Sequence, residues 1–141
     1  MNYTDIISKW KEKKIDSIEK LDQQLSNFRI TFAYNSGTIE NPQITYHATR
    51  EVFENGKVIN FCGDTQTIFE IENQKKCYNF LVPKIINKDP ITSDLIKKIH
   101  YQLMQGVYDE HRWQKGERPG HYKIHDYVTV SYTHLTLPTK L

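Results

Sequence analysis

The sequence has few cysteines and no long hydrophobic run, and both absences exclude classes of protein. Its 141 residues contain only Cys62 and Cys77, with no Cys-x-x-Cys motif, so neither a disulfide framework nor a zinc site is indicated. No apolar run approaches the length of a transmembrane helix, so we expect no membrane partner. The first residues lack the charged and then apolar pattern of a secretory signal, and we therefore expect the chain in a reducing cytoplasm.

The chain also lacks a strong net charge. Nineteen Lys and Arg residues against 17 Asp and Glu residues give +2 at pH 7, too mild for nucleic acid to be the expected main partner. Hydrophobic residues make up 38% of the chain and aromatic residues 12%, which is enough for the core of one domain.

Hydrophobic periodicity predicts a mainly α chain. Apolar residues recur at helical spacing between start and stop signals in five segments, namely residues 4–26, 28–41, 45–54, 65–83 and 92–105. We expect Thr4 or Asp5 to cap the first helix, Asn55-Gly56 to cap the third, Pro83 to end the fourth and Gly106 to cap the fifth. Residues 113–120 are predicted to form a loop, and the apolar residues of 122–128 have strand-like composition.

The first predicted helix has a basic surface. Five lysines lie among three acidic residues, Glu12, Asp16 and Glu19. A basic helix can bind nucleic acid or an acidic membrane, but the mixed signs favour a solvated face.

The segment from Asn27 to Pro42 carries a hydroxyl and a carboxylate four residues apart. Ser36 and Glu40 lie one above the other on a helix that Pro42 should end. A carboxylate is unfavourable at the negative end of the helix dipole, and Gly37 costs about 1 kcal/mol relative to Ala. These penalties indicate a role for Glu40 other than stability. The alternative is a turn in which Glu40 is merely solvated.

The motif Ser36-x-x-x-Glu40-Asn41 resembles the inhibitory motif of Fic (Fido-fold) proteins. Later segments resemble that family in the same order, and Arg118-Pro-Gly-His-Tyr-Lys123 resembles its Arg-x-Gly-x-Tyr-Arg segment, with Lys123 in place of the usual Arg. The resemblance covers about residues 25–129. It implies the class in which the inhibitory helix precedes the catalytic core.

The resemblance implies a division of the chain into three parts. Residues 1–27 would form an N-terminal helix, and residues 28–129 the N-terminal part of a helical Fido domain, with the inhibitory helix at about 28–41 and a short β flap near the C-terminus. Residues 130–141 resemble a translated transposon-end sequencing adapter, which would make them a non-native tail. The alternative is a genuine edge strand, because residues 128–133 alternate between apolar and polar positions.

The implied activity is transfer of AMP from ATP to a hydroxyl side chain of a protein target, with Mg²⁺. Ser36, Glu40 and Asn41 would inhibit it, and the flap residues Gly120, His121, Tyr122 and Lys123 would align the target. The family's catalytic motif, His-x-Phe-x-Asp/Glu-Gly-Asn-Gly-Arg-x-x-Arg, is not in the 141 residues. We therefore expect ATP and Mg²⁺ to be cofactors of the full-length parent, with no catalytic residue and no cofactor in this fragment. The protein target is not identified, and a homo-oligomer is left open.

Three further interpretations remain beside this one. The chain would otherwise be a non-catalytic helical protein-interaction module that uses its basic first helix as the contact surface. His121 and His125 have the spacing of a helical zinc pair, but no third ligand is well placed, and we expect no metal site. Trp113 either stacks on a base or packs against the domain.

Overall fold

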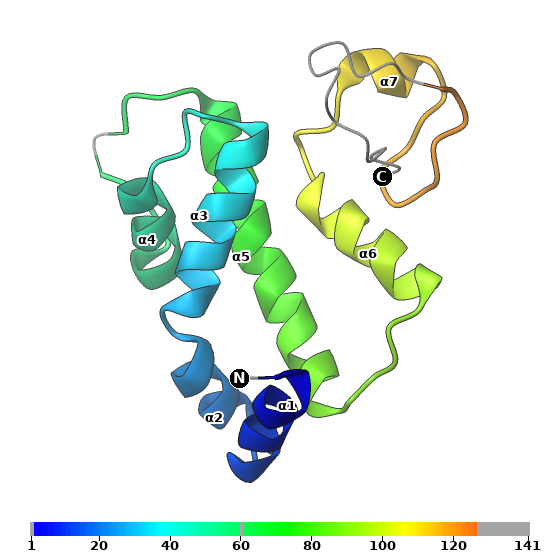
Figure 1. Ribbon diagram of the computed structural model, residues 1–141. Coiled ribbons are helices and arrows are strands. Elements are labelled where there is room, and N and C mark those ends of the chain that lie inside the picture. The colour runs from blue at the N-terminus through cyan, green and yellow to red at the C-terminus, as the bar shows by residue number, and fades with distance from the viewer. Residues whose placement is uncertain (1, 60, 127–141) are drawn as a thin grey trace.

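The computed structural model describes residues 2–59 and 61–126, and within those ranges the chain is helical and has no strand. The mainly α class is therefore confirmed, whereas the β flap is not found among the described residues. The helices, shown in Figure 1, are α1 (Tyr3–Glu12), α2 (Ile18–Leu25), α3 (Phe28–Glu40), α4 (Tyr46–Asn55), α5 (Thr65–Ile86), α6 (Ser93–Leu103) and α7 (Glu110–Gln114).

The long helix α5 organises the fold. It packs against α2, α3 and α4, and α6 packs against it from the other side (Figure 1). Two groups of buried apolar residues fill the space between α3, α4 and α5; they are Ile44, Ala48, Val52 and Ile71, and Ile30, Ala33 and Phe53. Full burial of an Ile, Val or Phe side chain contributes about 1.5–3 kcal/mol, so these clusters stabilise the packing of α3, α4 and α5.

The predicted helix over residues 4–26 is two helices. Lys14 has a left-handed backbone with φ of 48°, and Ser17 then begins α2 by accepting a hydrogen bond from the N–H of Lys20. The apolar face of α1 would continue at positions 13 and 14, but both residues are lysines. A single continuous helix would therefore have no apolar side chain at these positions to pack against the core. Asn2 is the N-cap of α1, and the predicted Asp5 completes a capping box, because its side chain accepts the N–H of Asn2.

Helix α3 confirms the helix predicted at 28–41, and its packing explains Gly37. A Cβ at Gly37 would lie 2.9 Å from Cδ1 of the buried Ile44. The glycine therefore allows the chain after α3 to pack closely against the helix. This close packing is the structural reason for a glycine at a position where it lowers helix propensity. Phe28 and Phe32 lie on the opposite, exposed side, with their ring centroids 5.6 Å apart.

Two predicted helix ends are wrong. Pro83 lies inside α5, which continues to Ile86, because proline removes a single N–H donor and the Asn87 N–H still bonds to the Pro83 carbonyl at 3.0 Å. Helix α6 ends at Leu103, two residues before the predicted end, and Met104 is its cap. The predicted cap of α4 is confirmed, since Gly56 has φ of 76°.

The segment after α6 also differs from the prediction. Trp113 lies in α7, which begins where the Asp109 side chain accepts a hydrogen bond from the N–H of Arg112. Residues 117–126 form an irregular loop in place of a strand, because the N–H of Ile124 bonds to the carboxylate of Glu117. Val128 and the tail 130–141 lie outside the described residues.

Among residues 2–59 and 61–126, none of the helices combines the length and the apolarity needed to cross a bilayer.

Candidate functional site

The last turn of α3 carries the three residues of the predicted inhibitory motif. Ser36 is half-buried, and Glu40, the final residue of the helix, is exposed. Neither side chain forms a hydrogen bond or ion pair within residues 2–59 and 61–126. The carboxylate of Glu40 is therefore available to a group outside that part of the chain.

Asn41 fastens this turn to α5. Its Nδ2 donates to the Thr67 hydroxyl at 3.0 Å and to the Glu70 carboxylate at 2.8 Å. Its Oδ1 accepts from the N–H of Gln43, and its own N–H continues the helix to the carbonyl of Gly37. Asn41 is thus a structural anchor for the residue beside Glu40.

The two partners of Asn41 were missed by the sequence interpretation. Thr67 is completely buried, and Glu70 also accepts a hydrogen bond from the side chain of Gln66 at 3.0 Å. The signal in the sequence was a hydroxyl and a carboxylate three residues apart, which share one face of a helix. Nothing local indicated that this face would meet Asn41.

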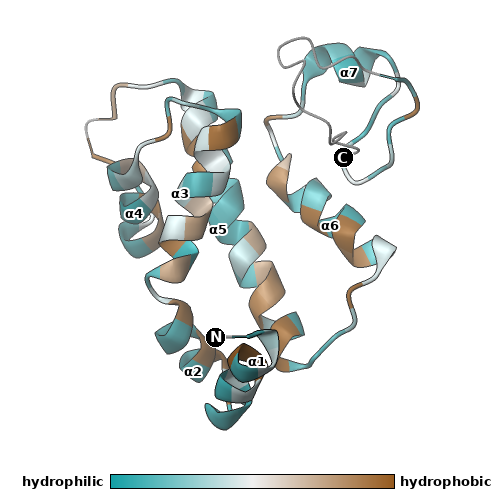
Figure 2. Ribbon diagram, in the orientation of Figure 1, coloured by the Kyte–Doolittle hydropathy of each residue, from teal (hydrophilic) through white to brown (hydrophobic). Residues whose placement is uncertain are grey.

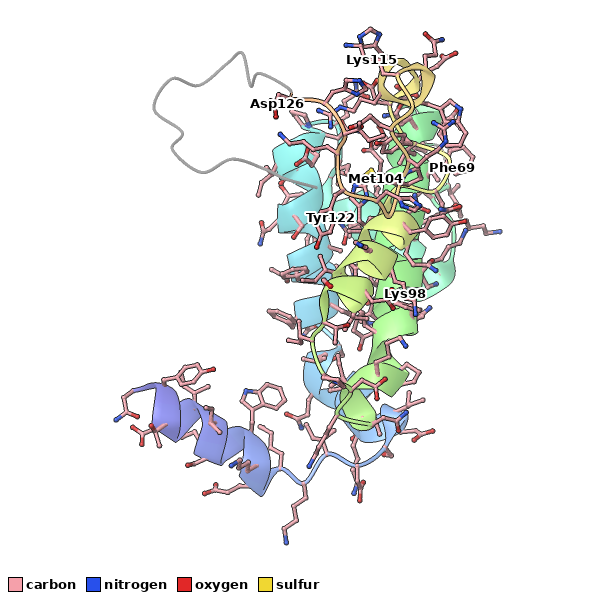
Figure 3. The ribbon with its side chains drawn as sticks, turned by 90° about the vertical axis from the view of Figure 1, so that its right-hand side faces the viewer. Phe69, Lys98, Met104, Lys115, Tyr122 and Asp126 are labelled. Atoms are coloured by element: carbon pink, nitrogen blue, oxygen red, sulfur yellow. The ribbon has the colours of Figure 1, made fainter. Side chains whose placement is uncertain are left out.

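The predicted flap residues lie against α6. Gly120, with φ of 81°, donates its N–H to Nδ1 of His100 at 2.9 Å. The ring of Tyr122 lies below the ammonium group of Lys97, 4.5 Å from its nitrogen to the ring centroid. Figure 3 shows the loop from Asp126 through Tyr122 running back along α6. His121 and Lys123 are exposed.

A buried carboxylate organises this loop from within. Glu117 is only 2% exposed; its Oε1 accepts the N–H of Ile124 and lies 3.7 Å from Nδ1 of His125. The guanidinium of Arg118 stacks on the half-exposed ring of Trp113, 3.7 Å from its centroid. Sequence reasoning missed Glu117, a single charged residue in a loop, and His100, a single polar residue on α6, since neither gave a periodic signal.

Helix α5 contacts both the end of α3, which carries the predicted inhibitory motif, and the end of α6, the helix that holds the predicted flap residues. Within the described ranges, the motif residues and the flap residues do not bond to each other. At one point α5 meets the α3 motif through Thr67 and Glu70. Further along, the buried amide of Asn73 donates to the carbonyls of Leu103 and Gln105, and so fixes the end of α6. The C-terminal end of α3, the N-terminal end of α5 and the C-terminal end of α6 all lie toward the same end of the helical bundle (Figure 1).

The helices toward this end differ in hydropathy. Figure 2 shows α7 as hydrophilic along its length, while apolar residues recur on α3, α5 and α6. The large exposed side chains here include Phe32, Ile39, Phe69 and Tyr122. These helices therefore retain apolar area that the described residues do not cover.

The described residues contain no group of three or more His, Cys, Asp or Glu side chains placed to hold a metal ion. The Gly-Asn-Gly sequence that the Fic resemblance would require for phosphates is not in the chain. The buried Cys77 is not an activated thiol, because burial raises its pKa to about 11.

No family model matches the chain, and no curated protein or solved structure matches it either.

Proposed function

We propose that this chain is the N-terminal part of a Fic-type protein adenylyltransferase, in which α3 is the inhibitory helix. The observation that supports this most is the position and environment of Glu40. It ends a well-packed helix, it is exposed, and it has no partner within the described ranges. The order of family-like segments in the sequence gives independent support.

The proposed inhibition is a competition for an arginine. On the Fic resemblance, the catalytic motif would place an Arg opposite Glu40, and that Arg would otherwise hold the γ-phosphate of ATP. A bidentate Arg–carboxylate pair has fixed geometry and withdraws both donors of the guanidinium. The motif is not in these 141 residues, so on this proposal the chain would contribute the inhibitor and not the nucleotide site.

The bonds of Asn41 make such an inhibitor rigid. Two side-chain hydrogen bonds to α5 immediately after Glu40 restrict the last turn of α3 to one position. A carboxylate held in place loses less entropy on pairing than one on a mobile loop. The flap, held on α6 at Gly120, would position a hydroxyl of the target protein beside the same site.

The experiment begins with the DNA downstream of codon 129. We expect an open reading frame that continues through a Gly-Asn-Gly-Arg motif, and a stop codon there would contradict the proposal. In the full-length protein, Glu40→Gly should raise incorporation of labelled AMP by at least about tenfold, which is about 1.4 kcal/mol of activation free energy. Glu12→Gly is the matched control, because Glu12 is the exposed last residue of α1 as Glu40 is of α3. Equal incorporation by wild type and Glu40→Gly, with both folded, would end the proposal.

A second candidate function is a non-catalytic protein-interaction module. One observation favours it, namely that α1 has no buried residue and projects from the bundle (Figure 3). Its apolar side chains share one face and are all exposed; they are Tyr3, Ile6, Ile7 and Trp10. On this alternative, Trp10→Ala would abolish binding of a protein partner, and Glu40→Gly would have no effect on any activity.

A further inference from the structure

The loop after α7 is held on α6 by an acceptor that can be protonated. The N–H of Gly120 donates to Nδ1 of His100 at 2.9 Å. A histidine ring nitrogen accepts a hydrogen bond only while it carries no proton. In the imidazolium form Nδ1 carries a hydrogen that would face the N–H of Gly120, so the bond is replaced by repulsion.

The loop fits closely at this point and cannot easily shift to another acceptor. A Cβ on Gly120 would lie 3.0 Å from Cβ of Tyr101 and 3.2 Å from the carbonyl oxygen of Lys97. The backbone of the loop therefore lies directly against one turn of α6. Its φ of 81° is a conformation that residues with side chains rarely adopt.

The groups around His100 do not favour its charged form. The ring of Tyr108, before α7, stands perpendicular to the imidazole at a centroid distance of 6.3 Å, and α7 contributes the cation Arg112. On α6 itself, Lys97 is a second cation and lies over Tyr122. From α5, the side chain bonded to the end of α6 is the neutral Asn73. The buried carboxylate of the loop, Glu117, is directed to Ile124 and His125.

Burial, followed by the positive charge of Arg112, lowers the pKa of His100 from its ordinary value of 6.5. The neutral form that accepts from Gly120 is therefore the form present at neutral pH.

We propose that His100 is a pH-dependent latch, which holds residues 117–126 on α6 while it is neutral and releases them when it is protonated. The latch is a property of the described residues, and it does not depend on the proposed transfer of AMP.

Amide hydrogen exchange of the whole chain, read by NMR at about pH 7.5 and about pH 5, tests the latch. After correction for the intrinsic exchange rate, protection of the Gly120 amide should fall as the pH drops below 6.5, the ordinary pKa that His100 regains when the loop is released, by up to about tenfold for each pH unit until the lowered pKa of the latched state is reached. Amides of the core, such as that of Ile71, should keep their protection, which shows that the loss is local. Equal protection of Gly120 at both pH values in the wild-type chain would overturn the proposal.

Two variants assign the effect to one residue. His100→Asn places an amide oxygen near the position of Nδ1, so it keeps an acceptor that does not titrate, and Gly120 should remain protected at both pH values. His121→Asn removes an exposed histidine of the same loop and should leave most of the pH dependence in place. Loss of Gly120 protection at low pH that is as large in His100→Asn as in wild type would also contradict the latch. If His100→Asn does not fold, the comparison of Gly120 protection at the two pH values in the wild-type chain still decides whether the latch exists.

Discussion

The side-chain nitrogen of Asn41 lies 2.8 Å from a carboxylate oxygen of Glu70, so the end of α3 is tied to the first turns of α5 by a charge-assisted hydrogen bond. The same nitrogen also reaches the buried hydroxyl of Thr67. These bonds fix the position of the residue before Asn41, which is Glu40. The inhibitory-motif interpretation assigns Asn41 to the motif, and the structure gives it an anchoring role.

Replacement of Asn41 by Ala should destabilise the chain. It removes three side-chain hydrogen bonds, one of them to a carboxylate, and leaves the buried Thr67 oxygen without that donor. We expect a loss of about 1–3 kcal/mol in the free energy of unfolding, measured by urea denaturation. Asn35→Ala is the control, because Asn35 is exposed on the same helix. Equal midpoints for Asn41→Ala and wild type would show that the anchor contributes nothing.

The explanation of Gly37 predicts opposite signs in two backgrounds. In the wild-type chain, Gly37→Ala places a Cβ 2.9 Å from Cδ1 of Ile44 and should cost about 1–3 kcal/mol through overpacking. Ile44→Val removes that Cδ1 atom. In the Ile44→Val background, Gly37→Ala should instead stabilise the chain by up to about 1 kcal/mol, which is the difference in helix propensity. Thermal unfolding of the four proteins measures the cycle, and additive effects would contradict the close contact.

The local features of the fold were predictable, and the contacts between them were not. Helices α3 and α4 follow from apolar spacing, and the end of α4 from Gly56, because these signals lie within one segment. The bonds of Asn41 reach residues 26 and 29 positions away, and no periodicity within either helix indicates such a pair. The buried Glu117 was unpredictable for the same reason. Its carboxylate bonds the backbone of Ile124, and this replaces the strand that the composition favoured.

Glu117 should determine whether the loop after α7 is folded. Glu117→Ala removes the acceptor of the Ile124 N–H and leaves a cavity at a position that is 2% exposed. We expect trypsin to cleave after Lys123 several-fold faster in this variant, because cleavage requires local opening. Glu117→Gln keeps an oxygen that accepts the same N–H, and it should be cleaved at a rate closer to wild type. Identical cleavage of all three proteins would show that the carboxylate does not hold the loop.

The raised pKa of Tyr78 predicts that the folded chain loses stability at high pH. Burial, together with the hydrogen bond to Asp22 at 2.8 Å, raises its pKa from 10.0 to about 12. The unfolded chain loses this proton first, so the contribution is fully present below pH 10 and is lost as the pH rises toward 12. Tyr78→Phe should therefore show a smaller decrease in unfolding free energy across that range. Tyr3→Phe, at a residue that is 78% exposed, is the control. A decrease of the same size in wild type and Tyr78→Phe would contradict the assignment.

The last prediction separates the roles of Ser36 and Glu40 in the full-length protein. The two residues are four apart on α3, so Ser36 lies one turn before Glu40 on the same face. If Ser36 only holds that face in place for the Glu40 carboxylate, Ser36→Ala should raise AMP incorporation less than Glu40→Gly does. In the Glu40→Gly background, Ser36→Ala should then have no further effect, since the group that it positions is absent. Independent roles would instead give a double variant whose increase is the product of the two single increases. Labelled-AMP incorporation by the four proteins, each shown to be folded by circular dichroism, distinguishes these outcomes, and an increase from Ser36→Ala that persists without Glu40 would assign Ser36 a contact of its own.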